Sequence, residues 1–188
     1  RCHEFGLSPW DPMNDSLLPP KKLKEVLKEN EQLLHHASAV LAKLYPTVNS
    51  KGLVTIIVDR FGTIIHKVGQ LDVDDHADIL KIGSNWSEKN KGTNAMGVAI
   101  YEKKPITTHA DHHFFIKNQF LTCAASPIFS PDGDLIGAVN ISARKELYHP
   151  FTISFAMLVA ESIQSHLLLE QSHQEKLLTL KELDYISN

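Results

Sequence analysis

The densest group of side chains able to do chemistry lies in residues 109–115, which read His-Ala-Asp-His-His-Phe-Phe. Imidazoles and a carboxylate this close together could bind Zn or Fe, with Cys123 completing the ligand set. No second pair of ligands recurs at an interval diagnostic of a metal site, so solvated or ligand-facing histidines are the other interpretation. We predict no metal here, and a metal or redox sensor using the His109 to His113 cluster and Cys123 stays the alternative function.

Cys123 also raises the possibility of nucleophilic catalysis, because a nearby histidine could serve as its base. It stands, however, in the apolar run Leu-Thr-Cys-Ala-Ala, which is typical of a buried structural thiol rather than of a reactive one. The sequence also lacks GxxxxGK[ST] and any GxGxxG after a strand, the motifs that bind phosphates. We therefore predict that this segment is not an enzyme, with no catalytic residue and no cofactor.

Composition narrows the class of protein further. The 188 residues carry 19 Lys and Arg against 22 Asp and Glu, a net charge of −3, and 43% are hydrophobic, which is typical of one soluble domain with extensions. Near-balanced charge argues against direct contact with nucleic acid. Residues 151–169 are too polar for a membrane span, and two cysteines in 188 residues suit the reducing cytoplasm. An Arg at position 1 with no signal peptide indicates a piece excised from a longer chain.

The elements that must position these residues begin with an irregular arm, residues 1–19, and an amphipathic helix predicted over 20–45 that stops near Pro46. Its apolar residues repeat in heptads with a polar Asn30 at one a position, as in paired helices. Packing of this helix on its own sheet is the other interpretation. We favour self-association, with Leu33 and Val40 in the seam between two copies.

Two hairpins follow in the sequence. Residues 53–58 and 63–68 flank Asp-Arg-Phe-Gly, and residues 121–129 and 135–142 flank Ser-Pro-Asp-Gly. A short strand at 106–109 brings the count to five, and a long helix runs from about 148 to 183. This order predicts an α+β fold whose mainly antiparallel sheet of five to six strands has terminal helices on one face. The segment from 70 to 120 would roof a ligand pocket on the other face.

Several blocks together resemble the GAF domain of acetoin-type sigma-54-dependent transcriptional activators. They are Trp-Ser-Glu-Lys-Asn-Lys-Gly-Thr-Asn-Ala-Met-Gly at 86–97, His-Phe at 113–114, Leu-Thr-Cys-Ala-Ala-Ser-Pro-Ile at 121–128, and Asp-Gly at 132–133 followed by Gly137. One position departs from the family pattern, since His112 stands where glutamate is usual. The arm also resembles the segment that precedes this domain in such activators.

The resemblance implies a bacterial signal-input module that binds a small-molecule effector and forms a homodimer through its terminal helices. Ligand occupancy would pass along the C-terminal helix to an ATPase and a DNA-binding helix-turn-helix domain further along the chain. It implies four parts: an arm at 1–19, a dimerisation helix at 20–45, a sensor core at 52–147 and an output helix at 148–188.

Eight residues form the predicted ligand site. Thr93 can cap a helix that starts after Gly92, and with Asn94 it could offer backbone N–H groups and an amide to a polar or anionic effector. Trp86 either plugs the core or covers the site as a lid. The remaining predicted lining residues are His109, His113, Phe114, Phe120 and Cys123.

Overall fold

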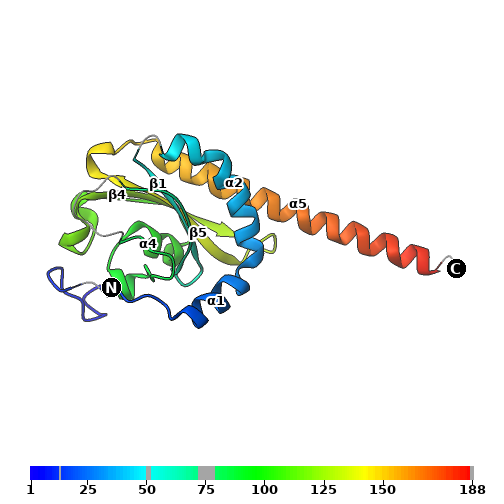
Figure 1. Ribbon diagram of the computed structural model, residues 1–188, viewed down its shortest axis with the longest axis horizontal. Coiled ribbons are helices and arrows are strands. Elements are labelled where there is room, and N and C mark those ends of the chain that lie inside the picture. The colour runs from blue at the N-terminus through cyan, green and yellow to red at the C-terminus, as the bar shows by residue number, and fades with distance from the viewer. Residues whose placement is uncertain (13, 50–51, 72–78, 187–188) are drawn as a thin grey trace.

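The computed structural model describes residues 1–186 except 13, 50–51 and 72–78. One five-stranded sheet has the order β2-β1-β5-β4-β3, and every pair of neighbours is antiparallel (Figure 1). Its strands are β1 (Val54–Asp59), β2 (Ile64–Gly69), β3 (Ile106–His109), β4 (Leu121–Phe129) and β5 (Leu135–Arg144). The predicted antiparallel sheet and both hairpins are therefore confirmed.

Turn chemistry explains the two hairpins. In the first, the Asp59 carboxylate accepts hydrogen bonds from the backbone N–H groups of Phe61 and Thr63, which closes the turn between β1 and β2. In the second, Gly133 adopts a φ of +86°, a conformation that residues with a side chain rarely take. The Asp-Gly signal in the sequence thus marks a real hairpin between β4 and β5.

Helices cover both faces of the sheet. The helical elements are α1 (Pro20–Glu29), α2 (Glu31–Asn49), α3 (Glu88–Lys91), α4 (Ala95–Glu102), η1 (Ala110–His112), η2 (Ile116–Asn118), η3 (Lys145–Leu147) and α5 (Thr152–Ile186). Helices α2 and α5 pack on one face and on each other, whereas α4 packs on the opposite face against β4 and β5. We call these the α5 face and the α4 face.

The helix predicted over 20–45 differs from expectation in two ways. It breaks at Asn30, whose backbone leaves the helical region (φ −106°, ψ 19°) and whose amide donates to the carbonyl of Val26. Asn30 is therefore a local helix terminator rather than a register residue in a helix pair. The second segment, α2, continues past Pro46 to Asn49 with one intrahelical hydrogen bond fewer.

The apolar stripe of α2 does not form the predicted seam between two copies. Leu33 and Val40 are 3% and 7% exposed, and they lie in a core cluster with Ile57, Val139 and Ile163 from the sheet and α5. The stripe buries against its own sheet because that face would otherwise expose a continuous apolar surface to water. Charged substitutions at Leu33 or Val40 would therefore disrupt the fold instead of separating a dimer.

Helix α5 begins as a core helix and then leaves the body of the domain (Figure 1). Ala156, Val159 and Ile163 of its first half are buried against the sheet. By length and hydropathy alone, residues 152–181 would be long enough and apolar enough to cross a membrane, contrary to the expectation from its polar residues. Only 28% of the apolar stretch that meets this test is buried in the domain, so core packing of the first half accounts for part of the composition.

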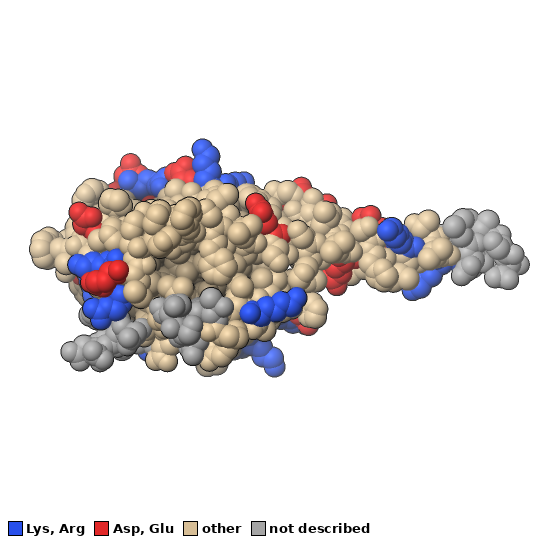
Figure 2. All heavy atoms as spheres, turned by 90° about the horizontal axis from the view of Figure 1, so that it is seen from above, with Lys and Arg blue, Asp and Glu red and all other residues tan. Residues whose placement is uncertain are grey.

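Charges of both signs intermingle on the surface. Figure 2 shows basic and acidic side chains side by side on the face it presents, and along the projecting part of α5. A nucleic-acid-binding surface needs basic side chains concentrated in a stripe, whereas the face in Figure 2 has basic and acidic side chains side by side.

Candidate functional site

The Gly-Thr-Asn-Ala segment builds the N-terminus of α4. Asn94 is the N-cap, and its side-chain oxygen accepts from the N–H of Gly97 at 3.0 Å. Its NH₂ group donates to the carbonyls of Trp86 at 3.0 Å and Gly92 at 2.8 Å, and the residue is 1% exposed. The cap is thus one residue later than the Thr93 expected from the sequence. Because all of its amide is engaged, Asn94 holds the loop and has no polar group left for an effector.

Two glycines of the motif allow close packing around this cap. A Cβ on Gly97 would lie 2.8 Å from the backbone nitrogen of Glu88 and the carbonyl oxygen of Trp86. A Cβ on Gly92, whose φ is +59°, would lie 2.6 Å from the side chain of Phe114. Glycine is therefore a structural requirement at both positions, because α3, α4 and the loop before β4 approach one another too closely for a side chain there.

Trp86 lies in the core. It is 1% exposed, its Nε1 donates to the Ser84 hydroxyl at 3.1 Å, and its ring packs with Val58 and Met96. Of the two alternatives left open by the sequence, the structure therefore favours the core plug over the lid. Thr93 faces the arm, with its hydroxyl 3.3 Å from the sulfur of Cys2.

A buried chain of polar side chains runs across the α4 face of the sheet. The Cys123 sulfur lies 3.1 Å from the Ser142 hydroxyl, and the Asn140 amide donates to the same hydroxyl at 2.7 Å. Asn140 is 0% exposed, and its side-chain oxygen has no hydrogen-bond partner among the described residues. A buried acceptor without a partner costs free energy, so it is the kind of group that a bound polar molecule satisfies.

This chain borders a small-residue surface under α4. Cys123 forms a cluster with Ala95 and Ala99 of α4 and Ala125 of β4, and Phe120 packs against it. Small side chains on both sides let α4 pack closely on the sheet. The predicted roof over 70–120 includes residues 72–78, which lie outside the described residues.

The Cys123 thiol is poorly suited to nucleophilic chemistry. Burial raises its pKa to about 12, with the hydrogen bond to Ser142 acting in the opposite direction. A thiol with that pKa is protonated at neutral pH, and the thiolate is the reactive form. Cys123 is therefore a weak hydrogen-bonding group in the wall of the site.

The histidines of the 109–113 segment do not converge. The ring of His109 stacks on Tyr148 with 4.7 Å between centroids, whereas His113 is 1% exposed and its Nδ1 lies 3.1 Å from the carbonyl of Ala110. His112 is exposed on η1. Among the described residues, no three His, Cys, Asp or Glu side chains are grouped to hold a metal ion. The alternative of a metal site built with Cys123 therefore gains no support from the geometry.

Unpartnered ring nitrogens distinguish His109 and His113 from the surface histidines. The Nδ1 of His109 and the Nε2 of His113 are both buried, and no described part of the chain offers either a hydrogen-bond partner. Phe114, next in the chain, packs edge-on against Phe115 at 5.3 Å and against His3 of the arm at 5.7 Å. Phe114 therefore connects the segment before β4 with the arm. Of the predicted lining residues, only Phe120 and Cys123 belong to the same hydrophobic cluster.

Acid should destabilise the fold through His113. Burial, with smaller contributions from His109 and His112, lowers the pKa of His113 from 6.5 to about 4. Stability from the neutral ring is complete above pH 6.5 and is lost as the pH falls towards 4. We expect a loss of about 2 kcal/mol in the free energy of unfolding between pH 7 and 4.5. Urea unfolding of His113→Asn should lack this part of the pH dependence.

The matched control for that experiment is His112→Asn, which changes an exposed ring on the same segment. Because His112 is only a minor cause of the lowered His113 pKa, this variant should keep most of the acid slope of the wild type. An unchanged acid slope in His113→Asn would show that protonation of His113 is not coupled to unfolding.

Sequence reasoning missed Asn140 and Ser142, which complete the polar chain. A signal was present, because Asn140 interrupts the apolar run Ile-Gly-Ala-Val-Asn-Ile in what is a central strand. In a central strand of a sheet that is covered on both faces, a polar amide has no contact with water and needs another polar partner. The pattern could have marked this residue as a candidate for ligand contact.

Comparison with known proteins is consistent with this architecture. The family model for the GAF domain matches residues 23–167. The crystal structure of the E. coli DhaR(N)-DhaL complex contains a chain that superposes with a TM-score of 0.87 at 17% identity, over 98% of this chain and 64% of that one. At that identity the likeness is one of fold.

Curated relatives are regulators of transcription. They include a signal-transduction and transcriptional-control protein of Clostridium beijerinckii, 26% identical over the whole chain. The acetoin dehydrogenase operon transcriptional activator AcoR of Bacillus subtilis is 25% identical over 93% of the chain, and the acetoin catabolism regulatory protein of Cupriavidus necator is 33% identical over 76%.

The chain spans between 22% and 30% of the length of these three relatives. The likeness to acetoin-type activators inferred from the motifs is confirmed, and the family match covers the sheet, α2, α4 and the first half of α5. The chain therefore belongs to the GAF domain family.

Proposed function

We propose that this domain is the signal-input part of a bacterial sigma-54-dependent transcriptional activator and that it binds a small uncharged effector on the α4 face of the sheet. The observation that carries the proposal is Asn140, whose buried side-chain oxygen lacks a partner at the end of the Cys123–Ser142–Asn140 chain. An effector with a hydroxyl or N–H group would satisfy this acceptor. Relatives named for acetoin metabolism support a small hydroxyketone as the first compound to test.

The electrostatics of this face favour a neutral ligand. The Cys123 thiol is protonated, and burial keeps His113 neutral at physiological pH. A charged effector would lose its hydration without gaining a charged partner from these groups. The earlier expectation of a polar or anionic effector at Thr93 and Asn94 is not retained, because the Asn94 amide is fully engaged.

A thermal-shift screen tests the proposal, with acetoin, diols, ketones and aromatic acids as probes. A compound that binds only the folded protein stabilises it by about 2.7 kcal/mol at one hundred times its Kd. We expect a neutral hydroxylated compound to raise the melting temperature and an aromatic acid to leave it unchanged. A screen in which none of these classes stabilises the protein at millimolar concentration would count against a sensing site.

Signal transmission is proposed to run through α5. Its projecting half carries exposed leucines that no described part of the chain covers, 45–68% exposed: Leu168, Leu169, Leu177, Leu178 and Leu180. Such leucines suit pairing with a second copy, and the output would be a change in how two α5 helices pack. An ATPase and a helix-turn-helix domain further along a longer chain would receive it in the cytoplasm.

Replacing Leu177 and Leu180 by lysine should convert a dimer to a monomer, because it places charges in the proposed seam between two α5 helices. Light scattering coupled to size-exclusion chromatography measures the mass directly. Thr179→Lys adds one positive charge, half that of the double variant, at a polar position of the same helix and should remain dimeric. A dimeric mass for the double leucine variant would move the interface elsewhere.

A further inference from the structure

The short helix α3 carries two charges that are almost completely buried. Lys91 is 1% exposed and Glu88 is 7% exposed. Buried charges of this kind are tolerated when each has a partner of opposite charge. Glu88 and Lys91 therefore each need a partner of opposite charge.

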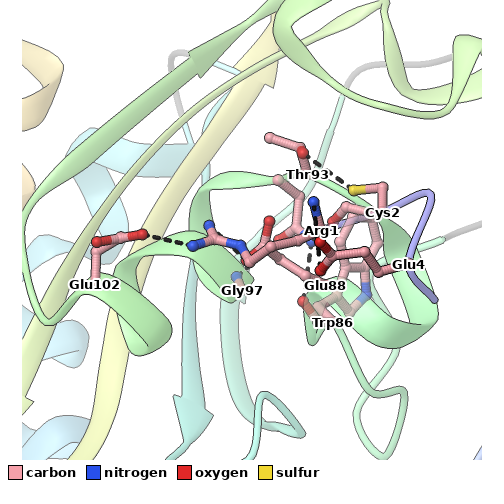
Figure 3. A network of polar contacts seen from close by, with 10 residues as sticks. Arg1, Cys2, Glu4, Trp86, Glu88, Thr93, Gly97 and Glu102 are labelled. Carbon is pink, nitrogen blue, oxygen red and sulfur yellow. Dashed lines mark hydrogen bonds and ion pairs between the residues drawn. The ribbon is translucent and has the colours of Figure 1, made fainter.

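Both charges are paired by the N-terminal arm. The guanidinium of Arg1 lies 2.8 Å from the Glu88 carboxylate, and it also reaches Glu102 of α4 at 2.6 Å (Figure 3). Asp15 lies 2.5 Å from the Lys91 ammonium, 76 positions away in the sequence. Two residues near opposite ends of the arm thus neutralise the two ends of one four-residue helix.

Contacts between these two points attach the arm to other parts of the same surface. Cys2 is 7% exposed against Thr93, and the carbonyl of Pro9 accepts from the N–H of Ile116. Leu18 continues the contact by donating its N–H to Gly83. These partners belong to residues 83–102 and 110–118, which we call the roof because α4 within it covers the α4 face of the sheet.

The roof also controls access to the sheet below it. Asn140 is 0% exposed, so a molecule can reach its side chain only if elements above it move. Movement of α3 away from its present place would separate Glu88 and Lys91 from the arm. Because the arm continues at Leu18 into the core of the α5 face and then into α1, the docked arm ties α3 to a part of the domain outside the roof.

We propose that the arm is a latch on the roof, held by the Arg1–Glu88 and Asp15–Lys91 pairs, and that its release is the step that lets the roof open. The role of the latch in effector entry rests on the proposed function. The latch itself does not, since its docking can be measured without any effector.

Alkylation by iodoacetamide, followed by mass spectrometry of each cysteine, tests the latch. Cys2 lies in the docked arm against Thr93 and reports release of the arm, whereas Cys123 lies beneath α4 and reports opening of the roof. We expect Asp15→Asn to label Cys2 about tenfold faster than wild type and to label Cys123 faster as well, by a smaller factor. Hydrogen exchange of peptides from 83–102 should rise in the same variant, and exchange in β1 and β5 should not.

Two controls make the result decisive. Glu25→Gln removes an exposed ion pair with Lys22 and should change neither cysteine. In a Lys91→Met background, where the buried charge is gone and Asp15 keeps only its exposed pair with Lys117, adding Asp15→Asn should accelerate Cys2 much less than it does in the wild type. The proposal is overturned if Asp15→Asn leaves either cysteine at the wild-type rate, if it raises hydrogen exchange in β1 and β5 as much as in 83–102, or if it has the same effect with and without Lys91.

Discussion

Replacing Asn94 by alanine is expected to lower the free energy of unfolding by about 3 kcal/mol, since it removes three buried hydrogen bonds at once. The lost partners are the N–H of Gly97 and the carbonyls of Trp86 and Gly92, none of which water can reach while α4 stays packed. In a domain of this size that loss corresponds to a fall in melting temperature of roughly 6–12 °C. Differential scanning calorimetry measures it.

Asn90→Ala is the matched control for this prediction. Asn90 also donates through its amide, to Asn85 at 2.8 Å and Ser87 at 3.1 Å, but it is only partly buried and caps no long helix. A loss of about 1 kcal/mol is expected there. Equal losses in the two variants would mean that the Asn94 cap stabilises the fold no more than the hydrogen bonds of Asn90 do.

Asn140→Leu should separate stability from ligand binding. The substitution removes a buried oxygen that has no partner among the described residues, together with the amide that donates to Ser142 at 2.7 Å, and Ser142 keeps its contact with Cys123. These two effects on the free energy of unfolding oppose each other, so its value without effector should stay within about 1 kcal/mol of wild type. Affinity for a stabilising compound found in the screen should fall by at least about tenfold, because its hydrogen-bond acceptor is gone.

Thr55→Val provides the control on the other side of the sheet. The Thr55 hydroxyl is also buried without a partner, but Thr55 pairs with Ile141, which packs against α5. This variant should keep or gain stability and bind the compound with wild-type affinity. Unchanged binding by Asn140→Leu would place the effector away from this face, and weakened binding by Thr55→Val would show that the effect is not specific to it.

Local patterns predicted the sheet well. Both hairpins followed from apolar runs that flank Asp and Gly turns, and the buried character of Cys123 followed from its alanine-rich neighbours. The helix before the sheet was harder to predict, because Asn30 fits both a polar position in a helix pair and a helix break. Only the packing of Leu33 and Val40 on the sheet distinguishes the two.

The site was predicted in part for a related reason. Residue types marked Asn94 and Cys123 as important, yet the partners of Asn94 are backbone groups that no sequence pattern identifies. Two ion pairs join residues far apart in the chain, Asp15 with Lys91 and Arg1 with Glu88. The spacing of residues in the sequence could not predict either of them. Long-range contacts of this kind depend on the final fold.

A crystal structure of the protein with the most stabilising neutral compound from the screen tests the central claim most directly. The predicted result is density for that compound on the α4 face, with a hydroxyl or N–H group within 3.2 Å of the Asn140 side-chain oxygen. Density confined to another surface, such as the outer groove of about 220 Å³ beside Phe61 and Tyr101, would contradict the claim.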